Sequence, residues 1–155
     1  MTIHIINGPN LNLVGLREPE VYGNRSLDQY LQELIEQFPQ HKIDVYQSNI
    51  EGEIVDRLQQ VGFEPDCGII LNAGGYTHTS VAIVDAVAAI TAPVVEVHIS
   101  NIYSREPFRH KSLLSPVCKG IVAGFGLDSY RLALLSLQLI EDKKDKKDNN
   151  NHCYD

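Results

Sequence analysis

The chain alternates between short apolar runs and segments in which apolar residues recur at the spacing of an α-helix. The apolar runs predict five strands, at residues 3–6, 43–46, 68–71, 93–97 and 121–123. The helical spacing predicts helices at residues 26–38, 51–61, 80–90 and 130–140. This repeated strand–helix order indicates an α/β fold, in which a five-stranded parallel sheet carries helices on both faces.

Single residues sharpen some of these helix boundaries. Ser26 and Gln29 form the sequence signature of a capping box at the start of the first helix, and Pro39 ends that helix. Gly62 is expected to end the second helix. The third helix is rich in Ala and Val nearly all round, so it is expected to be buried on more than one side. Asp85 interrupts its apolar surface, and an isolated carboxylate there is costly unless it is paired or lies at an interface.

The C-terminal segment has a different composition from the rest. Residues 142–155 are low-complexity and polar, and they cannot bury enough apolar surface to fix a structure. We therefore expect a single domain at residues 1–141 and a disordered tail at residues 142–155. His152 and Cys153 are better explained as part of this tail than as metal ligands.

Composition and charge narrow the classes of function. Hydrophobic residues make up 43% of the chain, as in a globular protein with a real core. No apolar run is long enough to span a membrane, and no secretory signal is visible. The three cysteines lack metal-ligand spacing, and Cys67 and Cys118 adjoin apolar runs, as expected for buried thiols of a cytoplasmic protein. The formal net charge of −7 argues against nucleic acid as the main partner.

Polar clusters follow three of the predicted strands. They are residues 7–10, 72–80 and 98–109. Ligands of open parallel sheets bind beyond the carboxyl ends of the strands, so these clusters are expected to form one site. Arg17, Arg105 and Arg109 fall in the same loops. The site can therefore attract an anion although the chain is acidic overall.

Two pairs of side chains in these loops suggest acid–base chemistry. Tyr22 follows Arg17 on a polar loop; a phenol has an ordinary pKa near ~10, and a nearby guanidinium favours the phenolate. Tyr22 is therefore a candidate general base, and the alternative is a tyrosine that packs the loop.

His98 stands two residues after Glu96, on the same side of a strand, where the carboxylate can orient the imidazole and keep it protonated. His98 is a candidate acid, and the alternative is a structural histidine.

Four blocks of this sequence resemble the signature of type II 3-dehydroquinate dehydratase, and they occur in the family's order. The blocks are residues 7–23 (NGPNLN…GLREPEVYG), 71–80 (LNAGGYTHTS), 96–102 (EVHISNI) and 105–110 (REPFRH). The resemblance covers residues 1–141. The departures are small: Val14, Leu16 and Pro107 replace the more usual Leu, Thr and an acidic residue.

The resemblance implies a flavodoxin-like three-layer sandwich and an enzyme that removes water from 3-dehydroquinate through an enolate, with no cofactor and no metal. It implies that Tyr22 is the base, made phenolate by Arg17. It places Asn10 at the enolate through a bound water. It makes His98 the acid, beside Glu96.

The resemblance also implies how substrate is bound and how the chains assemble. The implied substrate contacts are Asn72, His78, Ile99, Ser100 and Arg109. The Ile99 and Ser100 N–H groups and the Ser100 hydroxyl are suited to a carboxylate. Asp85 would reach the site of a neighbouring subunit, in a homododecamer built as a tetramer of trimers. The implied partners are thus the small-molecule substrate and further copies of the chain, with no nucleic acid and no membrane.

Rival functions of the same fold class are disfavoured by particular residues. The Gly-rich loop at residues 74–80 could bind phosphate, but both common nucleotide-binding glycine motifs are missing. A flavin-binding electron carrier would need a hydroxyl-rich loop after the first strand, where residues 7–10 read Asn-Gly-Pro-Asn. A receiver-type signalling module would need a phospho-acceptor Asp after the third strand, where Asn72 stands.

Two further enzyme classes are disfavoured by the histidines and the lysines. A metal hydrolase would need paired histidines such as H-E-x-x-H, and the six histidines show no such spacing. A Schiff-base dehydratase would need a buried lysine. Outside the tail the lysines are Lys42, Lys111 and Lys119, and none lies at the centre of an apolar strand.

Overall fold

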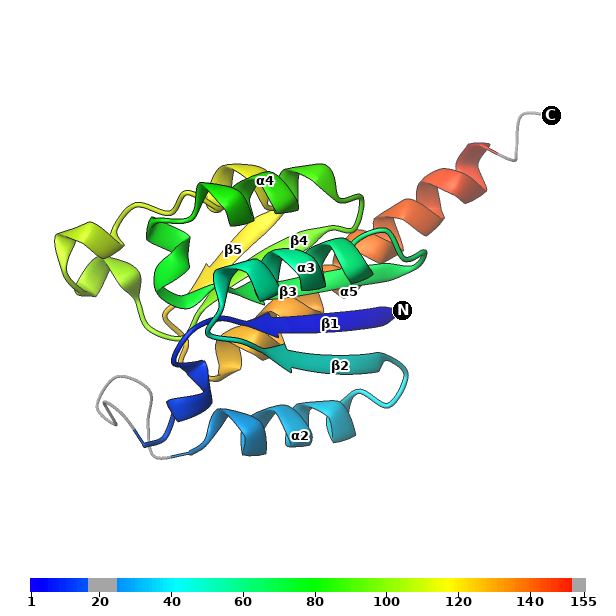
Figure 1. Cartoon of the computed structure of the whole chain (residues 1–155). Coiled ribbons are helices and arrows are strands. Elements are labelled where there is room, and N and C mark those ends of the chain that lie inside the picture. The colour runs from blue at the N-terminus through cyan, green and yellow to red at the C-terminus, as the bar shows by residue number, and fades with distance from the viewer. Residues whose placement is uncertain (17–24, 152–155) are drawn as a thin grey trace.

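The computed structural model describes residues 1–16 and 25–151, and Figure 1 shows how their elements are arranged. Within these residues, five strands form one sheet in the order β2-β1-β3-β4-β5, and every neighbouring pair is parallel. The strands are β1 (Thr2–Asn7), β2 (Lys42–Gln47), β3 (Cys67–Asn72), β4 (Val94–His98) and β5 (Gly120–Ala123). The predicted parallel sheet is confirmed, and its strand order is flavodoxin-like.

Helices cover both faces of the sheet. The helices α2 (Leu27–Gln37) and α5 (Asp128–Asn151) pack on one face, and α3 (Glu51–Val61) and α4 (Val81–Ala89) pack on the other. Successive side chains of a strand point to opposite faces. Ile3 and Ile5 of β1 therefore join the core under α2 and α5, while Ile6 joins the core under α3 and α4. This arrangement confirms the predicted three-layer sandwich.

The helix starts follow local signals that were visible in the sequence. The Ser26 Oγ accepts the Gln29 N–H at 3.1 Å, and the Gln29 Oε1 accepts the Ser26 N–H at 3.4 Å. The predicted capping box is therefore present. The Ser80 Oγ accepts the Ile83 N–H at 3.0 Å and so caps the start of α4. The bounds of α3 are the predicted ones.

The prediction that α4 is buried on more than one side is wrong for the single chain. Ile83, Ala86 and Val87 are its buried residues, whereas Val81 is 63% exposed and Asp85 is exposed as well. A helix that lies on a sheet buries only one stripe against it. The remaining apolar surface of α4 faces away from the other residues that the structure describes.

The last helix also differs from the prediction. The sequence predicts an end at Ile140 and a disordered tail from residue 142, but α5 continues to Asn151, and the polar side chains of residues 142–149 are exposed. Extending a helix that is already nucleated adds one hydrogen bond per residue, and Asp142 with Lys146 has the favourable i,i+4 spacing. The division into a domain at residues 1–141 and a separate tail stays a prediction, and residues 152–155 lie outside the described part.

None of the helices in the described ranges is long and apolar enough to cross a membrane.

Candidate active site

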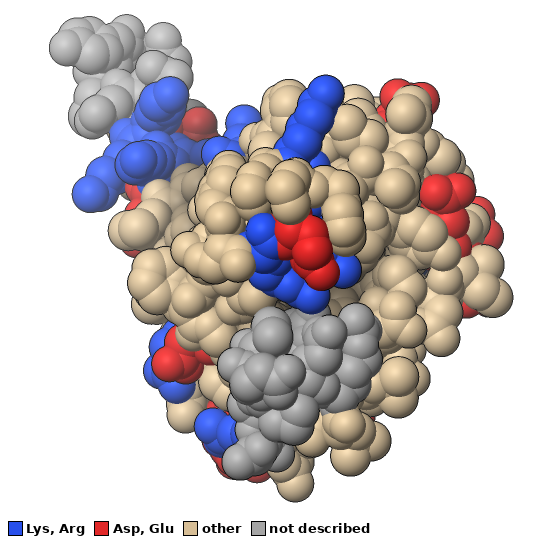
Figure 2. All heavy atoms as spheres, turned by 90° about the vertical axis from the view of Figure 1, so that its left-hand side faces the viewer, with Lys and Arg blue, Asp and Glu red and all other residues tan. Residues whose placement is uncertain are grey.

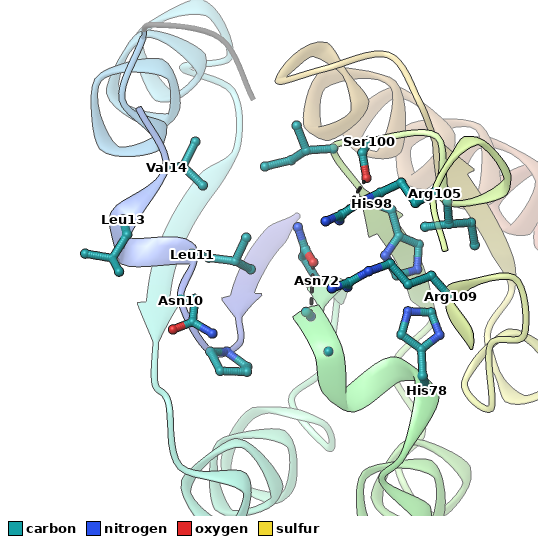
Figure 3. A pocket seen from close by; sticks show the side chains of 15 residues that line it. Asn10, Leu11, Leu13, Val14, Asn72, His78, His98, Ser100, Arg105 and Arg109 are labelled. Atoms are coloured by element: carbon teal, nitrogen blue, oxygen red, sulfur yellow. Dashed lines mark hydrogen bonds between the residues drawn. The ribbon is translucent and has the colours of Figure 1, made fainter. Parts of the chain in front are cut away.

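A pocket opens at the carboxyl ends of β1, β3 and β4 (Figure 3). Asn7 lies opposite Asn72 in the parallel register, and His98 ends β4, so the polar segments after these strands converge. The residues that line the pocket are Pro9, Asn10, Leu11, Leu13, Val14, Asn72, Gly74, Gly75, His78, His98, Ile99, Ser100, Ile102, Arg105 and Arg109. The polar clusters after three strands therefore meet as predicted.

The turn after β1 forms one wall of this pocket. The Gly8 N–H donates to the Asn72 carbonyl oxygen at 2.7 Å, and a Cβ on Gly8 would lie 2.5 Å from the Ala73 carbonyl oxygen, so only glycine permits this approach. Asn10 has a φ of 69°, in the left-handed region that asparagine tolerates. Its N–H donates to the Asn49 Oδ1 at 3.0 Å. These bonds fix the turn that carries Asn10 to the pocket.

Asn72 belongs to a buried chain of hydrogen bonds below the pocket. Its Nδ2 donates to the Tyr130 hydroxyl at 2.9 Å, and its Oδ1 accepts the Gly74 N–H at 3.2 Å. The Tyr130 hydroxyl in turn donates to the Asn7 Oδ1 at 2.6 Å. These bonds set the orientation of the Asn72 amide, so its second N–H remains for a ligand.

Glu96 and His98 lie on the same side of β4, as the sequence predicts. The imidazole Nε2 and the Glu96 Oε2 are 2.6 Å apart, with Glu96 fully buried and His98 6% exposed. An ionised carboxylate only accepts hydrogen bonds, so the His98 Nε2 carries the hydrogen. The Nδ1 of His98 is then the nitrogen left for a ligand.

His78 stands next to His98 and ends the short 3₁₀ segment η2 (Gly74–His78). The two rings stack with centroids 6.3 Å apart and an interplanar angle of 18°. The His78 Nδ1 lies 2.7 Å from the Lys111 carbonyl oxygen. Because a carbonyl oxygen only accepts, this Nδ1 carries a hydrogen and the His78 Nε2 is left for a ligand.

Ile99 and Ser100 continue the chain directly after β4. The Gly126 N–H donates to the Ile99 carbonyl oxygen at 3.0 Å, and the Gly124 N–H donates to the His98 carbonyl oxygen at 3.2 Å. The loop after β5 therefore holds the backbone of this segment. Ile99 and Ser100 both line the pocket, and their role in substrate binding stays a prediction.

Arginines supply the positive charge of the pocket. Arg109, in the 3₁₀ segment η4 (Pro107–Arg109), donates from its Nε to the Glu106 Oε2 at 2.8 Å, and Arg105 donates from its Nη1 to the Ser100 Oγ at 3.5 Å. The backbone N–H of Glu106 and then the Arg109 guanidinium lower the pKa of the Glu106 carboxyl. Figure 2 shows positive side chains gathered around acidic ones in a hollow of this face. Of the described residues that line the pocket, none is Asp or Glu, so the lining is cationic in a chain of net charge −7.

Four predicted site residues are not among the described residues that line this pocket, and one of them, Glu96, is fully buried and bonded to His98. Asp85 lies exposed on α4 and is not part of the lining. Arg17 and Tyr22 lie outside the described residues. Within residues 1–16 and 25–151, no group of three or more His, Cys, Asp or Glu side chains could hold a metal ion.

The sequence did not reveal every residue that builds the site. Tyr130 contacts Asn72 across 58 positions, and Ser112 and Ser115 contact Glu96 across 16 and 19 positions. Contacts of this kind depend on the fold and leave no local pattern. Arg105 did carry a signal, because it lies in a polar loop after a strand, together with Arg109.

Together, the fold and the pocket define a flavodoxin-like α/β protein whose site suits a small anionic ligand beside an imidazole–carboxylate pair. The chain belongs to the class II dehydroquinase family, whose family model matches residues 1–138.

Relatives of known structure or curated function agree with this family. The 3-dehydroquinate dehydratase of an Exiguobacterium species is 54% identical over 138 residues, which cover 88% of this chain and 94% of that protein. The 3-dehydroquinate dehydratase of Campylobacter jejuni is 50% identical over 147 residues, covering 93% of this chain and 92% of that protein. The crystal structure of type II dehydroquinase from Butyrivibrio crossotus is similar with a TM-score of 0.86 and 43% identity, and the match covers 89% of this chain and 97% of that one.

Proposed function

We propose that the protein is a type II 3-dehydroquinate dehydratase, a hydro-lyase of the shikimate pathway that converts 3-dehydroquinate to 3-dehydroshikimate. The observation that carries this proposal is the Glu96–His98 pair, which faces a cationic pocket in a chain of the class II dehydroquinase family. The substrate is a cyclic acid with one carboxylate, several hydroxyls and a ketone. A pocket of arginines, imidazoles and amides matches these groups in charge and in hydrogen bonding.

The proposed reaction is an anti elimination in two stages. Tyr22, held as phenolate by Arg17, removes the proton next to the ketone, and an enolate forms. Asn10 supports the enolate oxygen through a bound water, because an amide supplies donors without adding a titrating charge. The hydroxyl on the next carbon then leaves as water, with a proton from His98.

Substrate binding is assigned to the residues around this pair. The backbone N–H groups of Ile99 and Ser100, with the Ser100 hydroxyl, bind the carboxylate. Asn72, His78 and Arg109 bind the remaining oxygens. The fixed Asn72 amide and the ligand-facing Nε2 of His78 support these roles.

We extend the proposal to assembly and location. The exposed apolar surface of α4 supports burial against another subunit, which would let Asp85 reach the site of its neighbour in a dodecamer arranged as a tetramer of trimers. A cytoplasmic location agrees with free Cys67 and Cys118, neither of which forms a disulfide in the described part.

The test is the ultraviolet absorbance of the purified protein after addition of 3-dehydroquinate, with chelator and without added cofactor. The product is a conjugated enone and absorbs where the substrate does not, so we expect a rise. Tyr22→Phe removes the base alone and is expected to abolish the rise while ligand affinity is kept. Tyr46→Phe, on β2 outside the pocket lining, is the matched control. A flat trace from the folded wild type would reject the reaction, and turnover by Tyr22→Phe would reject only the base.

A further inference from the structure

Glu96 is held by more than its histidine. Its side chain is fully buried, and one oxygen, Oε1, accepts the hydroxyls of Ser112 at 2.8 Å and Ser115 at 2.9 Å. The other oxygen, Oε2, faces the His98 Nε2 at 2.6 Å. The two hydroxyls therefore share one carboxylate oxygen, and the imidazole contacts the other.

The hydrogens of this cluster can be assigned from its partners. The Ser112 Oγ also accepts the N–H groups of Leu114 at 3.2 Å and Ser115 at 3.1 Å. Its single hydrogen is therefore directed at Glu96. With both hydroxyls and the imidazole N–H as donors, Glu96 only accepts. Three donors already point at this fully buried carboxylate, and each bonds more strongly to a charged oxygen than to a neutral one, so the cluster favours ionised Glu96.

The same short segment also holds the second imidazole of the site. The Lys111 carbonyl oxygen accepts from the His78 Nδ1 at 2.7 Å, directly before Ser112, and the Leu113 N–H donates to the Thr77 carbonyl oxygen at 2.9 Å. Residues 111–115 are thereby tied to η2 and to β4 at once. This anchoring keeps the serine hydroxyls at a fixed distance from Glu96.

We propose that Ser112 and Ser115 are positioning residues for the dehydration, which keep Glu96 ionised, turn its Oε2 to His98 and so set the strength of His98 as an acid. This inference rests on the proposed function. Neither serine lines the pocket, so both act through Glu96 and do not touch the substrate.

Among the described residues, few other charged or titratable groups lie near the pair. His78 stacks on His98, and Arg105 and Arg109 line the same pocket. Cys118 lies near Glu96, and burial, followed by the negative charge of Glu96, raises the pKa of its thiol to about 12, so it stays neutral. The serines are the neutral donors that act on the carboxylate itself.

The effect of the hydroxyls on the proton of the pair has a definite sign. Two O–H donors stabilise the negative charge of the unprotonated Glu96–His98 pair. Without them the pair holds its proton more tightly. A proton that is held more tightly is released less readily to the leaving hydroxyl, and it is lost only at higher pH.

The experiment measures kcat and KM for 3-dehydroquinate across pH in the full chain, for Ser112→Ala, Ser115→Ala and the double variant. We expect kcat to fall by about tenfold for each single variant, a part of what a general acid contributes. The alkaline limb of the kcat profile should move to higher pH, and KM should stay unchanged. Ser115→Thr keeps a hydroxyl and should restore both kcat and the limb. Ser136→Ala, which loses a hydroxyl bonded to the Ala133 carbonyl oxygen of α5, should match the wild type.

Several outcomes would overturn the proposal. A fall in kcat with an unmoved or lowered alkaline limb would mean that the hydroxyls only support the loop, and a raised KM would mean that they contact the substrate. Nuclear magnetic resonance titration of the His98 imidazole provides a readout without turnover, and its midpoint should rise in the double variant. If the wild type shows no turnover but this midpoint rises, the proposed function fails, whereas the action of the two serines on the Glu96–His98 pair stands. If the midpoint does not rise in a variant that remains folded, the serine assignment fails.

Discussion

His4 and His98 are both buried histidines, on the two strands that flank β3, and each forms a bond from Nε2 to a carboxylate oxygen. The distances are 2.7 Å to Glu64 and 2.6 Å to Glu96. The surroundings differ. Glu64 is 43% exposed at its side chain, whereas Glu96 is fully buried. The other nitrogen of His98 faces the pocket, while the His4 Nδ1 is buried without a hydrogen-bond partner among the described residues, 3.8 Å from Asp44.

This difference shows what turns a histidine–carboxylate pair into an acid–base group. The bond itself is the same in both places. Only His98 combines a buried carboxylate partner with a second nitrogen that can reach a ligand. His4 is therefore expected to serve folding, and His98 to serve turnover.

The largest expected effect is on turnover in His98→Ala. Loss of a general acid typically costs about 10²–10⁴-fold in rate, and we expect kcat to fall within that range while the protein stays folded. Steady-state kinetics with 3-dehydroquinate would measure this fall. A kcat within about tenfold of the wild type would mean that another group or a water protonates the leaving hydroxyl.

The second expected effect is on stability in His4→Ala. This change removes a buried side chain and its bond to Glu64, so the free energy of unfolding should fall by about 1–3 kcal/mol. Urea unfolding would measure the loss. The kcat should equal that of the wild type. A large loss of turnover in a folded His4→Ala protein would show that His4, like His98, is needed for turnover.

The smallest expected effect is that of Glu64→Gln. The amide oxygen can still accept the His4 N–H, and the side chain is half exposed, so the free energy of unfolding should change by less than about 1 kcal/mol. The same urea measurement applies. A fall in the free energy of unfolding of more than about 3 kcal/mol would show that Glu64 contributes as much as a buried partner, although its side chain is half exposed.

Much of the fold could be predicted because its signals are local. Apolar runs gave the strands, and Ser26 with Gln29 marked the start of α2. The length of α5 could not be predicted, because a charged segment that would not fold alone can continue an established helix. The one-sided burial of α4 was likewise hidden, since the composition of a helix does not say which partners lie within the same chain.

The residues of the site likewise include some that could be predicted from the sequence and some that could not. Glu96 and His98 could be paired from their spacing alone, because residues two apart share one side of a strand. The serines below Glu96 and the Tyr130 hydroxyl below Asn72 could not be assigned, since these contacts arise only when α5 and residues 111–115 pack against the sheet. The residues that line the pocket are therefore easier to predict from the sequence than the residues that hold them in position.

The extended end of α5 has a practical consequence. The strands point their carboxyl ends to one side of the molecule, and the last turns of α5 leave it on the other (Figure 1). A helix rises about 1.5 Å per residue, so residues 141–151 carry the attachment point roughly 15 Å along the helix axis. A dye, a sensor surface or a fused reporter joined after this helix would lie on the side of the molecule away from the pocket. The protein could therefore be attached at this point and still be assayed.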